Sequence, residues 1–298
     1  MKRYLLFDTL YAVGAAVMTV ALTCLRIAAS VDGYDAGVGY FASGNGYHVA
    51  AVALTLCALV AALVSSVLSC VGRVAVGGDP FGARIAAVVT GTVTLFFALT
   101  QLVTGISFGH RAGVCLFVAV ILLLPGVAYY VLTYLATLHR DLLRAVGAMC
   151  LVVFSVFYVF HYYFSFDMPF NGDLKILHIV AVLSMMLFYL SEAKRSLHLP
   201  RGIWGRFFAT CCFLLACSVG VSELFDFFVD KSATFEDFSH GLLLAVTGLY
   251  AFVRLLVERQ TVPTAEKTGA LASRSETIDA PPEQTDAKED SAEQNGQT

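Results

Sequence analysis

The stretch GVCLFVAVILLLPGVAYYVLTYLAT, residues 113–137, contains no charged side chain and decides the class of the fold. An uninterrupted apolar run of about 18 or more residues is typical of a transmembrane helix. At about 1.5 Å per residue the run can cross a hydrocarbon layer of about 30 Å, where only a helix satisfies its own backbone polar groups. The run does not show the alternation of a membrane β-barrel strand.

Seven further apolar runs lie on both sides of this stretch. The chain has 298 residues, of which 58% are hydrophobic and 14% are charged. Soluble domains are about 45–50% apolar and about 25% charged. The sequence therefore predicts an all-α integral membrane protein, a bundle of about eight transmembrane helices. We expect these helices at 5–28, 48–70, 85–107, 113–137, 145–164, 173–193, 204–222 and 239–257.

The basic residues are concentrated at alternate connections between the runs. They are Lys2, Arg3, Arg73, Arg84, Arg140, Arg144, Lys194, Arg195, Arg201, Arg206, Arg254 and Arg259. Basic connections favour the cytoplasmic side, so we expect the N- and C-termini to be cytoplasmic. The first run is longer than the apolar region of about 7–15 residues in a signal peptide, which favours a retained helix over the alternative of a cleaved signal.

The composition changes sharply after the last run. Residues 260–298 have no aromatic side chain, three prolines and eight acids against three bases. Such a segment cannot bury enough apolar surface to order itself. We therefore predict a transmembrane helical domain at 1–259 and a disordered acidic cytoplasmic tail at 260–298. The tail either serves only solubility or docks a cytoplasmic protein.

The third run carries a polar face. Its members are Thr90, Thr94, Gln101 and Thr104, whose spacings of 4, 7 and 3 place them on one side of a helix. One interpretation is the lining of a pathway for a small solute or cation. The other is hydrogen bonding between helices by Thr and Gln, worth about 0.6 kcal/mol on average in membranes, and this second interpretation is favoured.

The connections predicted to face outward are rich in acids and histidines. The candidate outer-face polar cluster comprises His161, Asp167, Lys175, His178, Glu223, Asp226, Glu236, Asp237 and His240. Glu236 and His240 share a helix face, and a carboxylate with an imidazole can bind a divalent metal ion. No tight ligand motif such as H-E-x-x-H accompanies them, so a hydrated rim is the favoured interpretation.

The stretch HYYFSFDMPFNGDLKILH, residues 161–178, joins the fifth and sixth runs. Pro169 and Asn171 fit a turn followed by a helix start. Lys175 lies just inside an apolar helix, so we expect it to snorkel outward or to pair. A short connection makes the two helices antiparallel neighbours, which allows His161 and His178 to approach each other.

Asp167, Asn171, Lys175–Ile176 and the segment MLFYLSEAKRSL at 186–197 provide a resemblance over about thirty residues. This pattern resembles a segment of uncharacterised multi-pass membrane proteins from Gram-positive anaerobic bacteria. The resemblance implies a bacterial plasma membrane and the same loop–helix layout, and it implies no activity, substrate or cofactor. Within the segment, Glu192 and Arg195 are three residues apart, which suits an ion pair.

These features favour a transport or permease-like function for a small solute or cation, because the outer connections are acidic and attract cations. One alternative is an outward-facing sensor that signals through its tail. An intramembrane enzyme ranks last, because no set of histidine and acid ligands is expected inside the helices and no P-loop or G-x-S-x-G motif occurs. The sequence predicts the lipid bilayer as a partner, and it predicts no catalytic residue, metal ligand set, cofactor or nucleic-acid partner.

Overall fold

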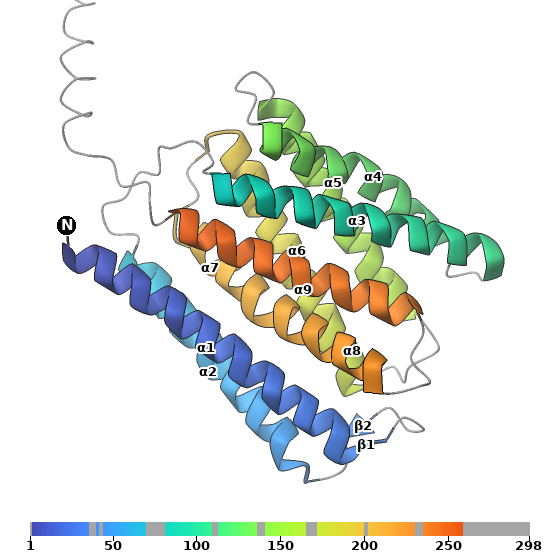
Figure 1. Cartoon of the computed structure of the whole chain (residues 1–298), viewed down its shortest axis with the longest axis horizontal. Helices are drawn as coiled ribbons and strands as arrows, with labels where there is room; N and C mark the ends of the chain where they lie inside the picture. Colours follow the sequence, from blue (N-terminus) through green and yellow to red (C-terminus); the bar gives the residue numbers. More distant parts are fainter. Residues whose placement is uncertain are drawn as a thin grey trace, which may run out of the picture. The chain divides into compact units, whose positions relative to one another are not determined.

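The computed structural model describes residues 2–35, 40–41, 44–69, 81–108, 113–135, 141–164, 172–199, 202–229 and 235–258, and these residues form eight helical spans (Figure 1). The helices are α1 (Lys2–Gly33), α2 (Gly46–Ser69), α3 (Phe81–Phe108), α4 (Gly113–Leu135), α5 (Asp141–Phe164), α6 (Asp173–Ser196), α7 (Gly202–Cys212), α8 (Ser218–Val229) and α9 (Phe235–Glu258). A π-helical segment, η1 (Phe213–Cys217), joins α7 and α8 into one continuous span.

The helical membrane class predicted from the sequence is confirmed. Seven of the spans are long and apolar enough to cross a membrane, and Val120–Leu135 of α4 forms a shorter apolar helix. The strands β1 (Tyr34–Asp35) and β2 (Tyr40–Phe41) add only a two-residue antiparallel pair between α1 and α2. The predicted tail at 260–298 lies outside the described residues.

The helix ends differ from the apolar runs where polar side chains pack inside the bundle. The first run was expected at 5–28, yet α1 continues to Gly33. Arg26 is 6% exposed in this helix, and Ser30 Oγ donates to Asp226 Oδ1 of α8 over 3.2 Å. The apolar run was expected to end at residue 28, before the polar residue Ser30, although the helix continues to Gly33. At the start of α6 the cap residue is Gly172, while Asn171 lies outside the described residues.

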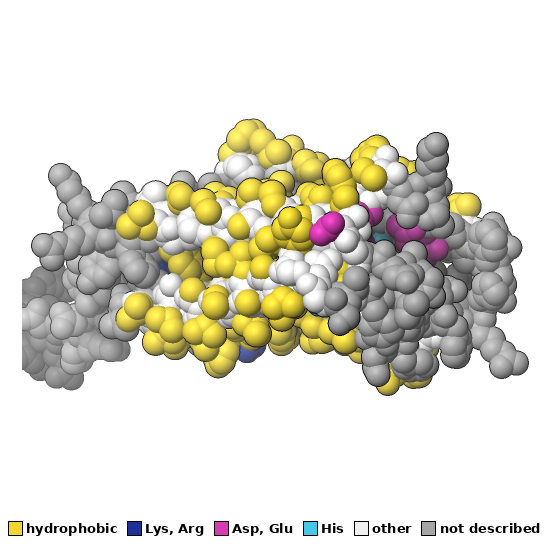
Figure 2. Space-filling view, turned by 90° about the horizontal axis from the view of Figure 1, so that it is seen from below, with side chains coloured by type: hydrophobic (Ala, Val, Ile, Leu, Met, Phe, Trp, Pro, Cys, Tyr) yellow, Lys and Arg dark blue, Asp and Glu magenta, His cyan; other side chains and the backbone are white. Residues whose placement is uncertain are grey.

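The larger core lies among α3, α4, α5, α6 and α9 (Figure 1). Phe97, Phe154, Phe188 and Tyr250 are among its fully buried side chains. A smaller cluster of Leu22, Ala58 and Leu214 joins the α1–α2 pair to the α7–α8 span. The apolar side chains that point away from these cores cover much of the surface seen in Figure 2, as lipid contact requires.

Glycines bring α8 and α9 into backbone contact. A Cβ atom on Gly241 of α9 would lie 3.0 Å from the carbonyl oxygen of Gly220 and 2.9 Å from Glu223 Cβ. A Cβ atom on Gly248, two turns further along α9, would lie 2.6 Å from the amide nitrogen of Cys217. Small residues at such a seam let helices approach closely in membranes. This close packing fixes the position of Glu223 along the helix axis, next to the first turns of α9.

Contacts between helices define two ends of the bundle. At one end, α1 meets α8 through Ser30 and Asp226, and α2 meets α6 through His48 Nε2 and Asp173 Oδ2, which are 3.9 Å apart. We call this the histidine end. Acidic side chains lie toward it in Figure 2, at the right of the view. The opposite end contains the last turns of α4, α6 and α9 (Figure 1).

Candidate metal centre

Three helices bring His178 of α6, Glu223 of α8 and His240 of α9 together near the histidine end. Each residue offers one ligand atom, and these three atoms lie within 4.8 Å of one another. His240 Nδ1 is 2.9 Å from each carboxylate oxygen of Glu223, and His178 Nε2 contacts Oε1 of the same carboxylate. The centroids of the two imidazole rings are 5.3 Å apart. One carboxylate thus bridges two histidines from different helices.

The centre is buried within the bundle. His178 is 4% exposed, His240 is 1% exposed and the Glu223 side chain is 14% exposed. His178 and His240 each follow the first residue of their helix by five positions, which at 1.5 Å per residue is about 8 Å. Gly241 allows the approach, because a Cβ atom there would lie 3.3 Å from Glu223 Oε2. The close α8–α9 seam therefore holds the carboxylate against His240.

Two tyrosines of α5 complete the surroundings of the imidazoles. The hydroxyl of Tyr162 is 3.2 Å from His240 Nδ1, and its ring stacks on His178 with centroids 5.3 Å apart. The Tyr158 ring lies 5.4 Å from the ring of His240. Within the part of the chain that the structure describes, His240 Nε2 is buried without a hydrogen-bond partner. Buried polar nitrogens of this kind are costly unless a ligand satisfies them.

Among the described residues, the group of three possible metal ligands includes no other member of the predicted outer-face cluster. His161 packs against the rings of Tyr158 and Tyr162, with centroids 6.0 and 6.3 Å away, whereas His178 contacts Glu223. Lys175 was expected to snorkel outward or to pair, and it is 1% exposed, so the outward alternative is wrong.

Three further acids of the cluster lie on α8 and α9, the helices that carry Glu223 and His240. Asp226 accepts a hydrogen bond from Ser30. Glu236 and Asp237 occupy the first turn of α9 and are partly exposed. The carboxylate that meets His240 is Glu223 rather than Glu236, the residue four positions earlier on the same helix. Asp167 lies outside the described residues.

The expectation that no histidine and acid side chains converge inside the helices is wrong. His178, Glu223 and His240 belong to three different apolar runs or their edges, so no local spacing relates them. The available signal was that each is ionisable at the margin of a membrane helix, which marks a functional candidate. Their convergence follows from helix packing, which the sequence pattern does not contain.

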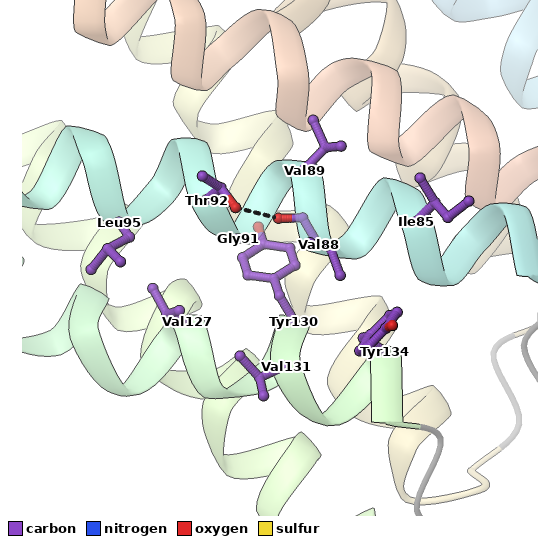
Figure 3. A pocket seen from close by; sticks show the side chains of 10 residues that line it. All are labelled: Ile85, Val88, Val89, Gly91, Thr92, Leu95, Val127, Tyr130, Val131 and Tyr134. Atoms are coloured by element: carbon purple, nitrogen blue, oxygen red, sulfur yellow. Dashed lines mark hydrogen bonds between the residues drawn. The ribbon is translucent and has the colours of Figure 1, made fainter.

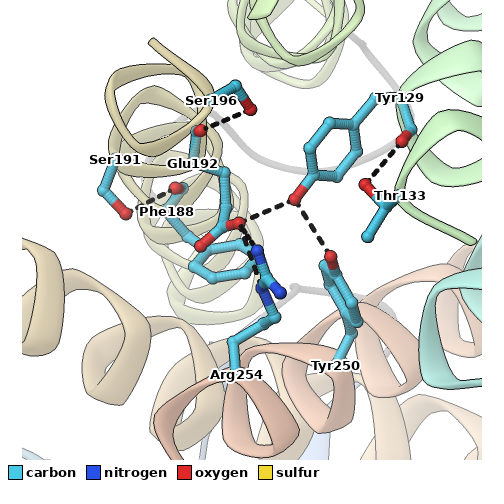
Figure 4. Close-up of polar contacts among 8 residues, drawn as sticks. All are labelled: Tyr129, Thr133, Phe188, Ser191, Glu192, Ser196, Tyr250 and Arg254. Carbon is cyan, nitrogen blue, oxygen red and sulfur yellow. Dashed lines mark hydrogen bonds and ion pairs between the residues drawn. The ribbon is translucent and has the colours of Figure 1, made fainter. Parts of the chain in front are cut away.

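A second polar cluster occupies the opposite end of the bundle (Figure 4). Glu192 Oε2 accepts hydrogen bonds from Arg254 Nε at 3.0 Å, from Arg254 Nη2 at 2.5 Å and from the Tyr129 hydroxyl at 2.8 Å. The Tyr129 hydroxyl is also 2.9 Å from that of Tyr250. Glu192 and Arg254 are each 1% exposed. The sequence suggested Arg195 as the partner of Glu192, and the structure shows Arg254 of α9 donating to it.

The predicted polar face of α3 is turned into the bundle. Thr90, Thr94 and Gln101 are each 1% exposed, while the Thr104 side chain lies outside the described part. Thr90 Oγ1 donates to the carbonyl of Ala86 at 2.7 Å, and Thr94 Oγ1 donates to that of Thr90 at 2.8 Å. Both hydroxyls thus bond to their own helix, which differs from the hydrogen bonding between helices that was expected.

A groove between α3 and α4 encloses about 510 Å³ but does not include that face (Figure 3). Its lining is mainly aliphatic, with Val88, Leu95 and Val131 among the exposed members. Tyr130 crosses below Gly91, where an added Cβ atom would lie 2.9 Å from Tyr130 Cβ. Such an open apolar groove suits lipid chains rather than a hydrated solute.

Comparisons of the chain with models of protein families, with curated proteins and with solved structures find no match. The class is therefore defined by the fold and the site. The chain is a multi-pass helical membrane protein that brings two histidines and a glutamate together in its interior.

Proposed function

We propose that the protein binds a divalent transition-metal ion through His178, Glu223 and His240. The observation that carries the proposal is the meeting of three ligand atoms, from three helices, within 4.8 Å of one another. Two imidazoles with a carboxylate are a common ligand set for Zn²⁺ and for Fe²⁺. Ca²⁺ and Mg²⁺ prefer all-oxygen sites, so they fit this ligand set poorly.

The metal ion leaves coordination positions for a further ligand. A structural zinc site is closed by four protein ligands, whereas a catalytic one has three and keeps an open position. Among the described residues this centre offers three ligand side chains, and the tyrosines Tyr158 and Tyr162 lie against the imidazoles. We therefore favour a membrane protein that binds or transforms a ligand at the metal, the intramembrane enzyme class that the sequence ranked last.

Placement in the membrane follows from the basic connections. They favour a cytoplasmic location for the end of the bundle opposite the metal centre. In this orientation the histidine end is outward, and the acids near it attract cations toward the site. The resemblance of helix six to bacterial membrane proteins supports the plasma membrane of a bacterium.

Cation transport is the second candidate, because α9 carries a buried polar stripe. His240, Thr247, Tyr250 and Arg254 follow at spacings of 7, 3 and 4 and are all 1% exposed or less. Tyr189 donates to Thr247 over 3.4 Å, and Tyr250 reaches the Glu192 cluster through Tyr129. Chains of such groups serve proton relays in transporters. Uptake of protons or metal ions by proteoliposomes containing the full-length protein tests this candidate.

Metal analysis of the purified full-length protein tests the metal proposal. Wild type is titrated with Co²⁺, whose visible absorption reports the ligand geometry, and a second sample is loaded with Zn²⁺ and analysed by mass spectrometry. We expect one ion per chain, and loss of this stoichiometric binding in His178→Ala, Glu223→Gln and His240→Ala. His161→Ala is the matched control, because it removes a neighbouring imidazole outside the ligand set. Equal binding by wild type and the double variant His178→Ala/His240→Ala contradicts the proposal.

A further inference from the structure

Arg26 carries a buried guanidinium whose outer nitrogens have no acceptor among the described residues. It is 6% exposed in α1, and neither Nη1 nor Nη2 has a hydrogen-bond partner in the described parts of the chain. An arginine is always charged, and a buried charge without a partner is strongly unfavourable. The other buried arginine of the bundle, Arg254, is paired with Glu192. Arg26 therefore calls for an anion that the described residues do not supply.

The helix register places Arg26 level with the metal centre. α1 and α8 run in the same direction, because each approaches the histidine end at its C-terminus, and they touch where Ser30 bonds to Asp226. Arg26 precedes Ser30 by four residues, and Glu223 precedes Asp226 by three, so both lie about one turn further into the bundle. Arg26 also lies close enough to His178 for their charges to interact.

Glu223 does not account for Arg26. Its Oε1 contacts His178 Nε2 and lies 2.9 Å from His240 Nδ1, and neither of its oxygens is a hydrogen-bond partner of the outer nitrogens of Arg26. The two outer nitrogens of a guanidinium form a planar fork that matches two oxygens of a phosphate or a carboxylate. The Arg26 guanidinium is thus available to donate hydrogen bonds to an anion. If the proposed function holds, a metal ion with open coordination positions lies beside it.

We propose that Arg26 and the metal ion bind a phosphate group between them. This inference rests on the proposed function, because the ion supplies the second contact. A divalent ion and Arg26 together exceed the charge of Glu223 by two, which matches a phosphate monoester of about −1.5 to −2 at neutral pH. Phosphate also has enough oxygens to reach both partners at once, whereas a carboxylate has only two.

The depth of the site suits a phosphate that belongs to a lipid headgroup as well as a free one. Arg26 precedes the last residue of α1 by seven positions, or about 10 Å along the helix. The bilayer is about 40–45 Å thick with its headgroups and about 30 Å without them, so such a position lies near their boundary. Both sources share the same phosphate chemistry, and the experiment separates them.

The test uses full-length protein in a maltoside detergent, which contains no phosphate, with Co²⁺ bound. Inorganic phosphate is added, and the change in Co²⁺ absorption gives its affinity. We expect Arg26→Gln to weaken phosphate binding about tenfold to a hundredfold, with Co²⁺ affinity unchanged. Arg26→Lys restores part of the affinity, because it returns the charge without the fork. Arg206→Gln, an arginine that lies over the Tyr11 ring, is the matched control and leaves phosphate binding as in wild type.

A second titration compares short-chain phosphatidic acid with the corresponding neutral diacylglycerol. Tighter, Arg26-dependent binding of phosphatidic acid than of inorganic phosphate supports a lipid headgroup, and the reverse order supports a free phosphate. The inference is overturned if phosphate does not bind, or if it binds equally to wild type and Arg26→Gln. In that case Co²⁺ binding still supports the proposed function. Failure of Co²⁺ to bind overturns the proposed function and this inference with it.

Discussion

Removal of one partner of the buried Glu192–Arg254 ion pair tests how much this pair contributes to the stability of the bundle. Arg254→Met removes both nitrogens that donate to Glu192 Oε2, at 3.0 and 2.5 Å. The carboxylate then retains the Tyr129 hydroxyl at 2.8 Å among its acceptor contacts described above. Because the Glu192 side chain is 1% exposed, water cannot replace the lost guanidinium.

The expected magnitude follows from this burial. Removal of one partner of a buried ion pair costs about 3–5 kcal/mol, because the other charge stays buried and uncompensated. Replacement of both partners by apolar residues of similar volume is near neutral, or stabilising by about 1–4 kcal/mol. We therefore expect Arg254→Met and Glu192→Met each to lower the free energy of unfolding by about 3–5 kcal/mol. The double variant should recover most of this loss, since the Tyr129 hydroxyl still has that of Tyr250 at 2.9 Å.

The assay is an SDS titration in mixed micelles, followed by circular dichroism and by the fluorescence of Trp204, the one tryptophan of the sequence. Arg26→Met is the matched control, because it removes a buried arginine whose outer nitrogens lack partners in the described residues. It should leave stability unchanged or raise it. Costs that add in the double variant, or a cost below about 1 kcal/mol for Arg254→Met, contradict this account of the pair.

Three further outcomes follow from the same structure. Gly241→Ala should cost about 1–3 kcal/mol and weaken Co²⁺ binding, because its Cβ atom would lie 2.9 Å from Glu223 Cβ; Gly14→Ala, with nothing within 4 Å, should not destabilise. Tyr162→Phe should weaken Co²⁺ binding about tenfold in a titration, because the hydroxyl, 3.2 Å from the His240 nitrogen that faces Glu223, lies within reach of an ion bound there or of its water ligand. Thr94→Val should change stability by less than about 1 kcal/mol in the SDS assay and leave any proteoliposome uptake unchanged, because its hydroxyl bonds to its own helix.

The spans could be predicted because lipid imposes one local rule on each of them. A run such as 113–137 must satisfy its backbone internally, so apolar length alone indicates a helix. The same rule misjudged α1, whose end at Gly33 lies beyond the predicted 28. Ser30 looks like a residue of a connection, yet it lies within the helix and donates to Asp226 of α8.

The residues of the candidate site were among those predicted from the sequence, but their contacts with one another were not predicted. His178, Glu223 and His240 stood in the outer-face cluster beside His161 and Asp226, with no pattern to separate them. The π-helical segment η1 lies between the start of the α7–α8 span and Glu223, and its i→i+5 bonding changes the direction in which later side chains point. An extrapolation from a regular helix therefore misplaces the carboxylate.

The sequence by itself determined that this protein is a bundle of membrane-spanning helices, because hydrophobic length is a property of each run alone. It also showed which ionisable residues lie near the ends of the helices. Only the tertiary structure decided that Glu223 meets both histidines and that Glu192 meets Arg254. Those partners belong to different helices, and their meeting depends on how side chains and the glycines of the α8–α9 seam pack in three dimensions.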